Sequence, residues 1–411
     1  RGLMAVTSGI EVAPRFPVLD ALRALGAFAV LATHVAFYAG TYTDHGTWGA
    51  FLSRLDVGVA IFFVLSGFLL SRPHLARAAL NLDRPAVGVY YWHRVLRIYP
   101  VYALTVVLAL LLLEDNAQFG LRDWLITLGL SNTATDSFPP SGLSQMWSLA
   151  VEVCFYLTLP LLMRAATSRH RLQRWRVLAV AGMMAAISVW WHLDGAPRSE
   201  SLNGGSPLQW LPAYLGWFAA GIVLALTHVV STSNNNAGHT GIGRRLSNRV
   251  LELGREPGVC WTLVAALMLV ATTSLAGPIV LEPASPAESL TKNLIYATVG
   301  ALIVLTGIAA EPGSAYTRLL DNAPARHLGI TSYSFFCLHL LVLDLLAPAV
   351  GFPLFGGHFL ALWLLTAVVS VVVAETSYRL LERPVLRLKN IRPFRRPRSI
   401  TGNATNGTKA K

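Results

Sequence analysis

The chain has 411 residues, of which 54% are hydrophobic and 13% are charged, and its mean hydropathy is +0.52. Because soluble domains are typically about a quarter charged, this composition excludes an ordinary soluble protein and favours one that crosses a membrane several times. The formal net charge of +12 would also suit a nucleic-acid partner, so the positions of the charges must decide.

Ten apolar stretches are long enough to cross a bilayer as helices of about 20 residues. In chain order they cover roughly residues 19–40, 56–72, 98–114, 147–164, 175–193, 209–230, 259–277, 291–310, 331–350 and 357–381. A shorter apolar segment at Trp124–Leu130 is too brief to span and is expected at the membrane interface. The sequence therefore predicts an all-α polytopic membrane protein. Its expected parts are an N-terminal segment (1–18), a transmembrane domain (19–385) and a basic, disordered tail (386–411).

Lysine and arginine are distributed very unevenly between the two sides that ten spans would define. Of the 33 cationic residues, 28 fall in the termini and in loops on the same side, and four fall in the opposite loops. Arg23 lies within the first span. The positive-inside rule therefore predicts that both termini are cytoplasmic. Topology and anionic lipid account for the net charge, so we expect the bilayer rather than nucleic acid as the partner.

The first span, "LDALRALGAFAVLATHV", carries two ionisable side chains on one helix face. Eleven residues at 100° each turn a helix by about three full turns plus 20°, so Arg23 and His34 face the same way about 16 Å apart. Such groups within a span usually face a wet cavity or a partner. Arg23 could instead snorkel to the headgroups beside Asp20, and His34 could make an interhelical hydrogen bond. Their shared face favours a functional role.

The second and third spans add small and basic residues. In "FFVLSGFLLS", Ser66 and Gly67 are typical of tight helix packing. In "YYWHRVLRIYP", Arg94 and Arg97 are three residues apart, just before the third span. Together with the arginines at 72 and 77, they predict a cytoplasmic mouth suited to phosphate groups. The alternative interpretation is ordinary positive-inside charge.

The fourth span, "QMWSLAVEVCFY", places Ser148 and Glu152 on one face. Because this span runs from outside to inside, Glu152 should lie at a depth similar to that of His34. An isolated carboxylate in the membrane is costly, and a neighbouring imidazole would relieve that cost. We therefore predict that the two side chains meet in a catalytic centre. The ninth span, "SYSFFCLHLLVLD", adds further candidates for the cavity lining. They are Tyr333, His339 and Asp344, and Asp20 of the first span joins them.

In this order and spacing, the motifs resemble those of the acyltransferase 3 family of integral membrane acyltransferases, from about residue 15 to residue 390. The matching motifs are Arg23-x10-His34, "FFVLSGFLLS", Arg94-x-x-Arg97, Ser148-x-x-x-Glu152, "SYSFFCLHLL" and "LERPVLR". The chain is similar in particular to actinobacterial macrolide and sugar O-acyltransferases. The resemblance implies ten spans in the bacterial cytoplasmic membrane, with both termini in the cytoplasm. Some relatives carry an additional C-terminal hydrolase-like domain, which we do not expect here.

The resemblance also implies transfer of an acyl group from cytosolic acyl-CoA to a hydroxyl, often on an extracytoplasmic sugar. The acceptor class stays open between a polysaccharide, a glycolipid and a secondary metabolite. We expect no bound cofactor or metal, because acyl-CoA serves as a substrate.

In the corresponding hypothesis, three arginines meet the CoA phosphates: Arg94, Arg97 and Arg23. His34 acts as the general base and Glu152 orients it, with Ser148 as a further candidate catalytic residue. An acyl-His34 intermediate is the alternative to direct transfer. The acceptor would enter beside the loop 136–145. The rival class is a proton-coupled transporter or flippase, because intramembrane His and Glu also suit proton transport.

Overall fold

The computed structural model describes residues 10–12, 14–44, 46–135, 139–167, 172–203, 206–233, 241–279 and 282–391. Most of the predicted basic tail, part of the N-terminal segment and residues 136–138 of the predicted acceptor loop lie outside these residues. Every secondary-structure element within the described part of the chain is helical, which confirms the all-α prediction.

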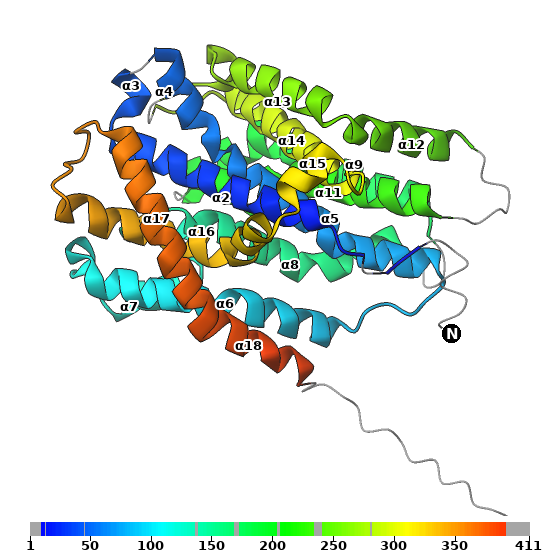
Figure 1. The fold of residues 1–411 in the computed structure, drawn as a ribbon, viewed down its shortest axis with the longest axis horizontal. Helices are drawn as coiled ribbons and strands as arrows, with labels where there is room; N and C mark the ends of the chain where they lie inside the picture. Colours follow the sequence, from blue (N-terminus) through cyan, green and yellow to red (C-terminus); the bar gives the residue numbers. More distant parts are fainter. Residues whose placement is uncertain are drawn as a thin grey trace, which may run out of the picture.

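Long helices run through most of the molecule; most lie side by side with roughly parallel axes, and α17 crosses them obliquely (Figure 1). They are α2 (Pro17–Tyr38), α5 (Gly58–Ala79), α6 (Val87–Leu112), α8 (Met146–Ala166), α9 (Arg174–Trp190), α11 (Leu211–Thr232), α14 (Pro286–Ile308), α16 (Ala323–Ala349) and α17 (Phe359–Ser377).

Shorter helical segments connect the long helices or extend them. They are α3 (Thr41–Asp44), α4 (Gly46–Ser53), η1 (Arg54–Val57), η2 (Glu114–Asn116), α7 (Leu121–Leu128), η3 (Asn132–Ala134), η4 (Trp191–Gly195), α10 (Ala196–Asn203), η5 (Pro207–Gln209), α12 (Ile242–Arg255), α13 (Pro257–Ala271), η6 (Ser274–Ala276), α15 (Ala315–Leu320), η7 (Tyr378–Glu382), α18 (Arg383–Arg387) and η8 (Leu388–Asn390).

The ten predicted spans correspond to nine continuous apolar helices and one broken pair among the described residues. The seventh span is the broken one: α12 and α13 meet at an angle of 83°. Pro257 is the first residue of α13 and cannot continue the hydrogen-bonded ladder of α12. The predicted extent of this span, to residue 277, is too long, because α13 ends at Ala271. The segment predicted at the interface contains the short helix α7.

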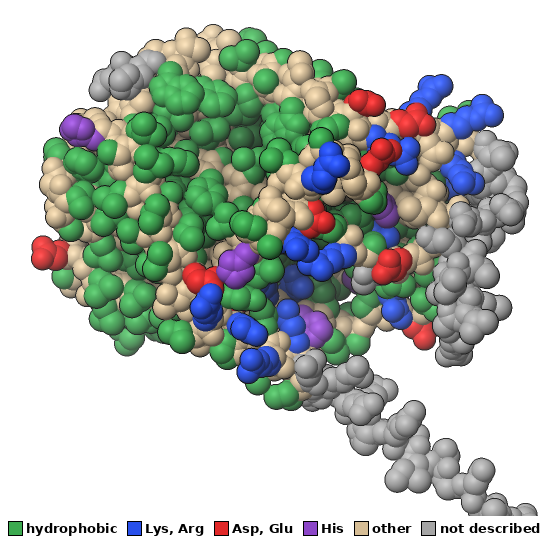
Figure 2. Space-filling view, in the orientation of Figure 1, with side chains coloured by type: hydrophobic (Ala, Val, Ile, Leu, Met, Phe, Trp, Pro, Cys, Tyr) green, Lys and Arg blue, Asp and Glu red, His purple; other side chains and the backbone are tan. Residues whose placement is uncertain are grey.

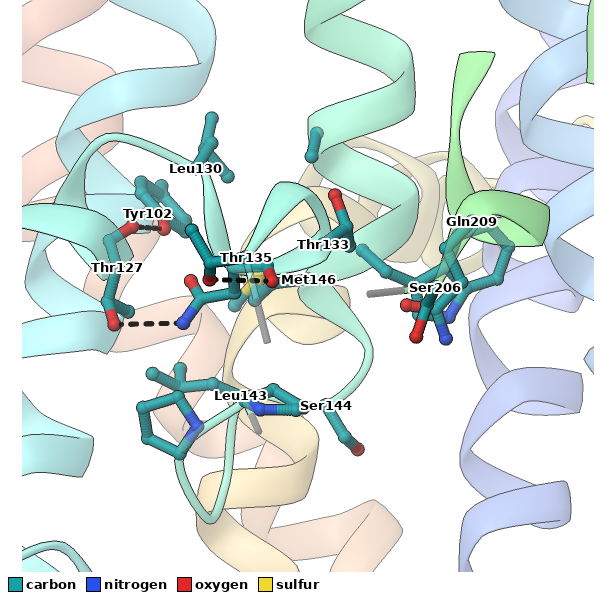
Figure 3. A pocket seen from close by; sticks show the side chains of 15 residues that line it. Tyr102, Thr127, Leu130, Thr133, Thr135, Leu143, Ser144, Met146, Ser206 and Gln209 are labelled. Atoms are coloured by element: carbon teal, nitrogen blue, oxygen red, sulfur yellow. Dashed lines mark hydrogen bonds between the residues drawn. The ribbon is translucent and has the colours of Figure 1, made fainter. Parts of the chain in front are cut away.

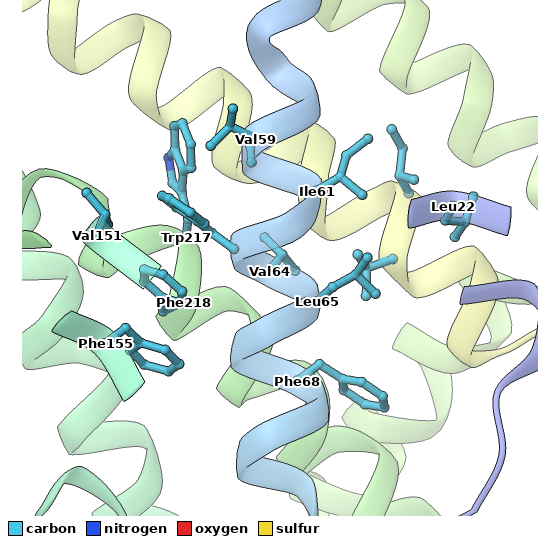
Figure 4. Packing of buried hydrophobic residues seen from close by; sticks show 14 of the residues in the cluster. Leu22, Val59, Ile61, Val64, Leu65, Phe68, Val151, Phe155, Trp217 and Phe218 are labelled. Carbon is cyan, nitrogen blue, oxygen red and sulfur yellow. The ribbon is translucent and has the colours of Figure 1, made fainter. Parts of the chain in front are cut away.

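Helix α5 lies at the centre of the bundle and packs against α2, α8, α11 and α14. Figure 4 shows side chains of α2, α8 and α11 arranged around it. The contact with α11 is backbone to backbone. A Cβ atom on Gly67 would lie 2.3 Å from the Phe218 carbonyl oxygen, and one on Gly221 would lie 2.2 Å from that of Val64. Gly67 therefore serves helix packing, as its sequence context predicted.

Charged side chains gather at one end of the bundle. In Figure 2, lysine and arginine cluster at the end that carries α12 and α18, and the rest of the visible face is largely apolar. Both the first described residues and the C-terminal helix α18 lie at this end (Figure 1). The arrangement matches the charge asymmetry of the sequence, so we treat this end as cytoplasmic and the other as extracytoplasmic.

Candidate active site

Five helices enclose a cavity of about 130 Å³ in the bundle, hereafter the inner cavity. Helices α2, α5, α6, α8 and α16 supply its walls. Its polar lining consists of Arg23, Ser66, Arg94, Arg97, Ser148, Glu152, Tyr156, Ser332 and Tyr333. The structure thus brings together six of the ten side chains that the sequence singled out, although they come from four different spans.

Glu152 is held by two hydroxyl groups. The Ser66 Oγ donates to its Oε1, and the Tyr156 hydroxyl donates to the same atom at 2.5 Å. The Arg23 guanidinium also interacts electrostatically with Glu152. A carboxylate with two donors and a nearby cation keeps its charge at much lower cost than an isolated one. The inner cavity therefore contains a carboxyl group that two hydroxyl groups hold in place beside a cation.

Neither hydroxyl partner of Glu152 was expected from the sequence. Ser66 had been assigned to helix packing together with Gly67, but only the glycine has that role. Tyr156 carried a usable signal, because it lies one helical turn beyond Glu152 and so shares its face. Ser148, on the same face, donates its hydroxyl to the Gln145 carbonyl at 3.0 Å and remains at the cavity wall.

Arg94 has free hydrogen-bonding capacity at the cytoplasmic side of the inner cavity. Its guanidinium lies over the rings of Tyr90 and Tyr156, at 6.0 and 5.7 Å from the ring centroids. Its Nε is buried and has no hydrogen-bond partner within the described chain. A buried donor without a partner is costly, so this atom is a natural contact for an anionic ligand.

Arg97 is instead committed to an ion pair. Its Nη1 donates to Glu382, which is 1% exposed and also accepts a hydrogen bond from the Ser334 hydroxyl at 2.9 Å. Tyr333 places its ring under the Arg97 guanidinium, at 5.6 Å. Glu382 belongs to the "LERPVLR" motif and ends the π-helical segment η7, a type of irregularity that is frequent at functional sites.

Arg94, Arg97 and Glu382 form a charged group at the cytoplasmic side, hereafter the cytoplasmic cluster. Lys389, which lies outside the spans, adds a further cation to it. Burial, followed by the neighbouring charges of Arg97 and Arg94, lowers the pKa of the Lys389 amine. Lys389 thus adds a third cation to Arg94 and Arg97, of which Arg97 is paired with Glu382, and the excess positive charge suits an anion. Arg72 and Arg77, expected at the same mouth, are engaged elsewhere: they donate to the backbone carbonyls of Glu11 and Asp83, respectively, among others.

Arg23 and Asp20 form an ion pair within α2, at 2.9 Å. The Arg23 side chain lines the inner cavity, and Asp20 does not. Arg23 is therefore placed between the acidic residue of its own helix and Glu152, rather than extended along the surface. This placement supports the functional interpretation of Arg23 over simple snorkelling.

His34 does not line the inner cavity, and the expected contact with Glu152 is not observed. Instead, the His34 ring lies 5.4 Å from that of His339 on α16. The ring of Phe336 lines the cavity and lies 5.8 Å from His339, and Phe62 packs against Phe336 at 5.6 Å. The Phe336 ring therefore lies between the inner cavity and His339, and Phe62 packs beside it. Helix numbering had predicted similar depths, but it could not predict how the helices are shifted along one another.

The tautomer of His339 follows from its hydrogen bond. Its Nδ1 lies 2.8 Å from the Phe336 carbonyl oxygen, which can only accept, so Nδ1 carries the proton. In the neutral ring, Nε2 is then an acceptor, and it is buried without a partner in the described structure. A buried acceptor beside a second imidazole can orient that ring or accept a proton from it.

Asp344 lies outside the inner cavity as well. Its carboxylate faces the backbone N–H of Gly142, in the loop that leads into α8. The same loop is tied to α16 by Gln145, whose Nε2 donates to the Cys337 carbonyl at 2.9 Å. Asp344 thus helps to hold the extracytoplasmic loop on α16, which differs from the cavity-lining role that was considered for it.

Comparison with known families identifies the chain. A family model described as an acyltransferase domain matches residues 16–376, a range that includes every residue of the inner cavity. The chain belongs to the acyltransferase 3 family. Two members of the cytoplasmic cluster, Glu382 and Lys389, lie just beyond the matched range. The family membership and the apolar helices together make this protein a multi-pass membrane acyltransferase.

Curated relatives of this acyltransferase are of two lengths. It is 27% identical to Acyltransferase MdmB of Streptomyces mycarofaciens, over 91% of this chain and 92% of the relative. It is 26% identical to the putative peptidoglycan O-acetyltransferase YrhL of Bacillus subtilis, over 92% of this chain and 56% of the relative. It is 25% identical to the peptidoglycan O-acetyltransferase OatA of Listeria monocytogenes, over 90% of this chain and 55% of the relative. No solved structure matches at a significant level.

Proposed function

We propose that the protein transfers an acyl group from cytosolic acyl-CoA to a hydroxyl of a sugar-containing acceptor on the extracytoplasmic side. The names of two relatives support the acceptor class, because they are described as peptidoglycan O-acetyltransferases. The positive charge at the cytoplasmic end supports a donor that carries several phosphates. A transporter would not require both an anion-binding site at the cytoplasmic end and a buried imidazole.

Arg94 and Lys389 would bind the phosphates of the donor at the mouth of the inner cavity. Arg97 would contribute charge from its fixed position beside Glu382. Because the cavity has a volume of only about 130 Å³, the nucleotide of CoA would remain at the mouth, and the acyl–pantetheine arm alone would enter. The arm would have to pass Phe62 and Phe336 to bring its thioester to His34. The rings of Phe62 and Phe336 would therefore have to rotate when acyl-CoA binds.

The reaction itself needs one base. His34 would accept the proton of the acceptor hydroxyl as the oxygen attacks the thioester carbonyl carbon. The C–O bond forms, the C–S bond breaks, and the CoA thiolate takes the proton from the His34 imidazolium. Products are the ester and free CoA. An imidazole is suited to this exchange because the same ring nitrogen can accept a proton and then return it.

Glu152 would have a different role from the one that the sequence favoured. With Ser66 and Tyr156 as its partners, it would compensate the charge of Arg23 and keep the inner cavity polar. Orientation of His34 would instead fall to its neighbour, His339. Glu152 and His339 would thus be positioning residues, and neither would contact the reacting carbon.

The observation that carries the proposal is the unpaired Arg94 Nε in the inner cavity, whose wall residue Phe336 contacts His339 of the His34–His339 pair. The test is release of free CoA by purified protein in nanodiscs, with a panel of acyl-CoAs and cell-envelope extract as the acceptor. Since Cys154 is exposed, a Cys154→Ser background keeps the thiol-reactive dye from labelling the protein.

We expect CoA release in this background, its loss in His34→Ala, and no change in His327→Ala. His327 is the matched control, because its exposed ring pairs with Glu375 and lies outside the inner cavity. No release from any donor, from protein that binds acyl-CoA and is folded, would contradict the proposal. A flux that depends on a proton gradient would then favour the transporter.

A further inference from the structure

A second cavity, of about 200 Å³, opens at the extracytoplasmic end of the bundle; we refer to it as the outer cavity (Figure 3). Its walls come from α6, from the segment that contains α7 and η3, from the start of α8 and from η5. The acyl-transfer chemistry proposed above uses none of these residues. The outer cavity therefore requires its own explanation.

The lining of the outer cavity is polar but uncharged. None of its fifteen residues is Asp, Glu, Lys, Arg or His. Among the described residues that line the cavity, a charged ligand would find no counter-ion, and burying it would be costly. Eight of the lining residues carry hydroxyl or amide groups and the other seven are apolar, so the ligand that fits is neutral, with both hydrogen-bonding groups and an apolar face.

Some polar groups in the wall are used to build it, and others are free. Asn132 donates to the Thr127 hydroxyl at 3.3 Å, and the Tyr102 hydroxyl donates to the Thr127 carbonyl. In contrast, no hydrogen bond within the described chain engages the side chains of three neighbouring polar residues. They are Ser144, Ser206 and Gln209, which Figure 3 shows around the cavity. These groups can donate to and accept from a ligand.

The volume of the outer cavity and its aromatic wall further limit the class of ligand that fits. A cavity of about 150 Å³ holds a benzene molecule, so 200 Å³ accommodates one six-membered ring with substituents. Trp147 contributes a flat apolar face, and its ring is itself packed against that of Tyr214 at 5.1 Å. A pyranose has a matching form, with an apolar C–H face and a rim of hydroxyl groups.

We propose that the outer cavity binds one neutral glycosyl unit of the acceptor. This inference rests on the proposed function, since it assigns the bound sugar to the acyl acceptor. Position supports the assignment: Trp147 lines the outer cavity, and the next residue, Ser148, lines the inner one. Phe63 of the inner cavity also lies 6.5 Å from the Trp147 ring. A sugar held in the outer cavity would thus be adjacent to the path of the acyl chain.

The test is saturation-transfer NMR of simple sugars on the purified full-length protein in nanodiscs. The probes are methyl β-glucopyranoside and N-acetylglucosamine, which are neutral, and glucuronate and glucosamine, which are charged at neutral pH. We expect saturation of the neutral sugars alone. Equal saturation of the charged sugars, or none of any sugar, would overturn the proposal.

Two variants locate the binding. Gln209→Ala removes hydrogen bonds to the ligand and should weaken binding about fivefold. Ser206→Phe fills the cavity from an exposed position and should abolish it. Gln118→Ala is the matched control, because this exposed glutamine lies in the same extracytoplasmic segment, outside the outer cavity. Binding that survives Ser206→Phe, in protein with a wild-type melting temperature, would refute the site.

The same preparation separates this inference from the proposed function. His34→Ala should lose CoA release and keep the sugar signal. Release of CoA by wild type without any sugar signal would overturn the outer site and leave the acyl-transfer proposal standing. A sugar signal that responds to Ser206→Phe, without CoA release from any donor, would support the outer site and contradict acyl transfer.

Discussion

The ion pair between Arg97 and Glu382 makes a prediction that separates structural from ligand-binding arginines. Arg97→Ala would leave the Glu382 carboxylate, which is 1% exposed, without its cation. Glu382 connects the end of the last span to α6 and α16, through Arg97 and Ser334. We therefore expect Arg97→Ala to destabilise the protein, whatever it does to acyl-CoA binding.

The structure sets the expected magnitude. Removing one partner of a buried ion pair costs about 3–5 kcal/mol. Because the Arg97 side chain is 27% exposed, and Ser334 still donates to Glu382, we expect a cost at or just below the low end of that range, about 2–3 kcal/mol. Glu382→Gln in the Arg97→Ala background removes the buried charge and should recover most of this loss.

Thermal unfolding in detergent, followed with a thiol-reactive dye, measures the effect. Cys260 and Cys337 are buried and react only as the protein unfolds, and Cys154→Ser removes the exposed thiol. The expected order of melting temperatures is wild type, then the double variant, then Arg97→Ala. Arg94→Ala serves as the control and should melt like wild type, because Arg94 forms no ion pair within the described chain. Equal stability of Arg97→Ala and wild type, or a double variant no more stable than Arg97→Ala, would refute the reasoning.

The remaining predictions concern the two cavities and the packing between helices. Arg94→Ala should raise KM for acyl-CoA by about 10- to 100-fold with little change in kcat, since it loses charge-assisted hydrogen bonds to phosphate; an unchanged KM would exclude that contact. His34→Ala should lower the rate of CoA release by about 10²- to 10⁴-fold without lowering the melting temperature, and near-normal turnover of a folded variant would exclude His34 as the base. Tyr156→Phe removes one of the two hydroxyl donors to Glu152 and should lower the melting temperature, to a degree similar to that of Ser66→Ala; no effect from either would mean that the carboxylate is held in some other way. Gly221→Ala forces a Cβ atom toward the Val64 carbonyl oxygen, 2.2 Å away, and should cost about 1–3 kcal/mol, whereas Gly182→Ala, where the added atom meets nothing within 4 Å, should be neutral in the same thermal assay.

Part of the site could be predicted because it depends on one helix at a time. The 3.6-residue repeat places Arg23 and His34 on one face of α2, whatever surrounds that helix. It likewise places Ser148 and Glu152 on one face of α8, and both residues line the inner cavity. Hydropathy and the positive-inside charge depend only on the composition of each segment, and they predicted ten spans. Nine of these are continuous helices among the described residues, but the break between α12 and α13 in the seventh was not predicted.

The sequence by itself thus determined the number of apolar helices, the uneven distribution of charge between their ends and the helix face that ionisable residues share, because each is a property of a single helix. Only the tertiary structure decided which of these residues meet. The shift of α8 relative to α2 brings Glu152 to Ser66 and Arg23, and leaves His34 beside His339. The packing of the last span against α6 pairs Arg97 with Glu382, 285 residues away in the chain. Such shifts are set by close contacts between helices, as at Gly67 and Gly221, and no pattern within one helix encodes them.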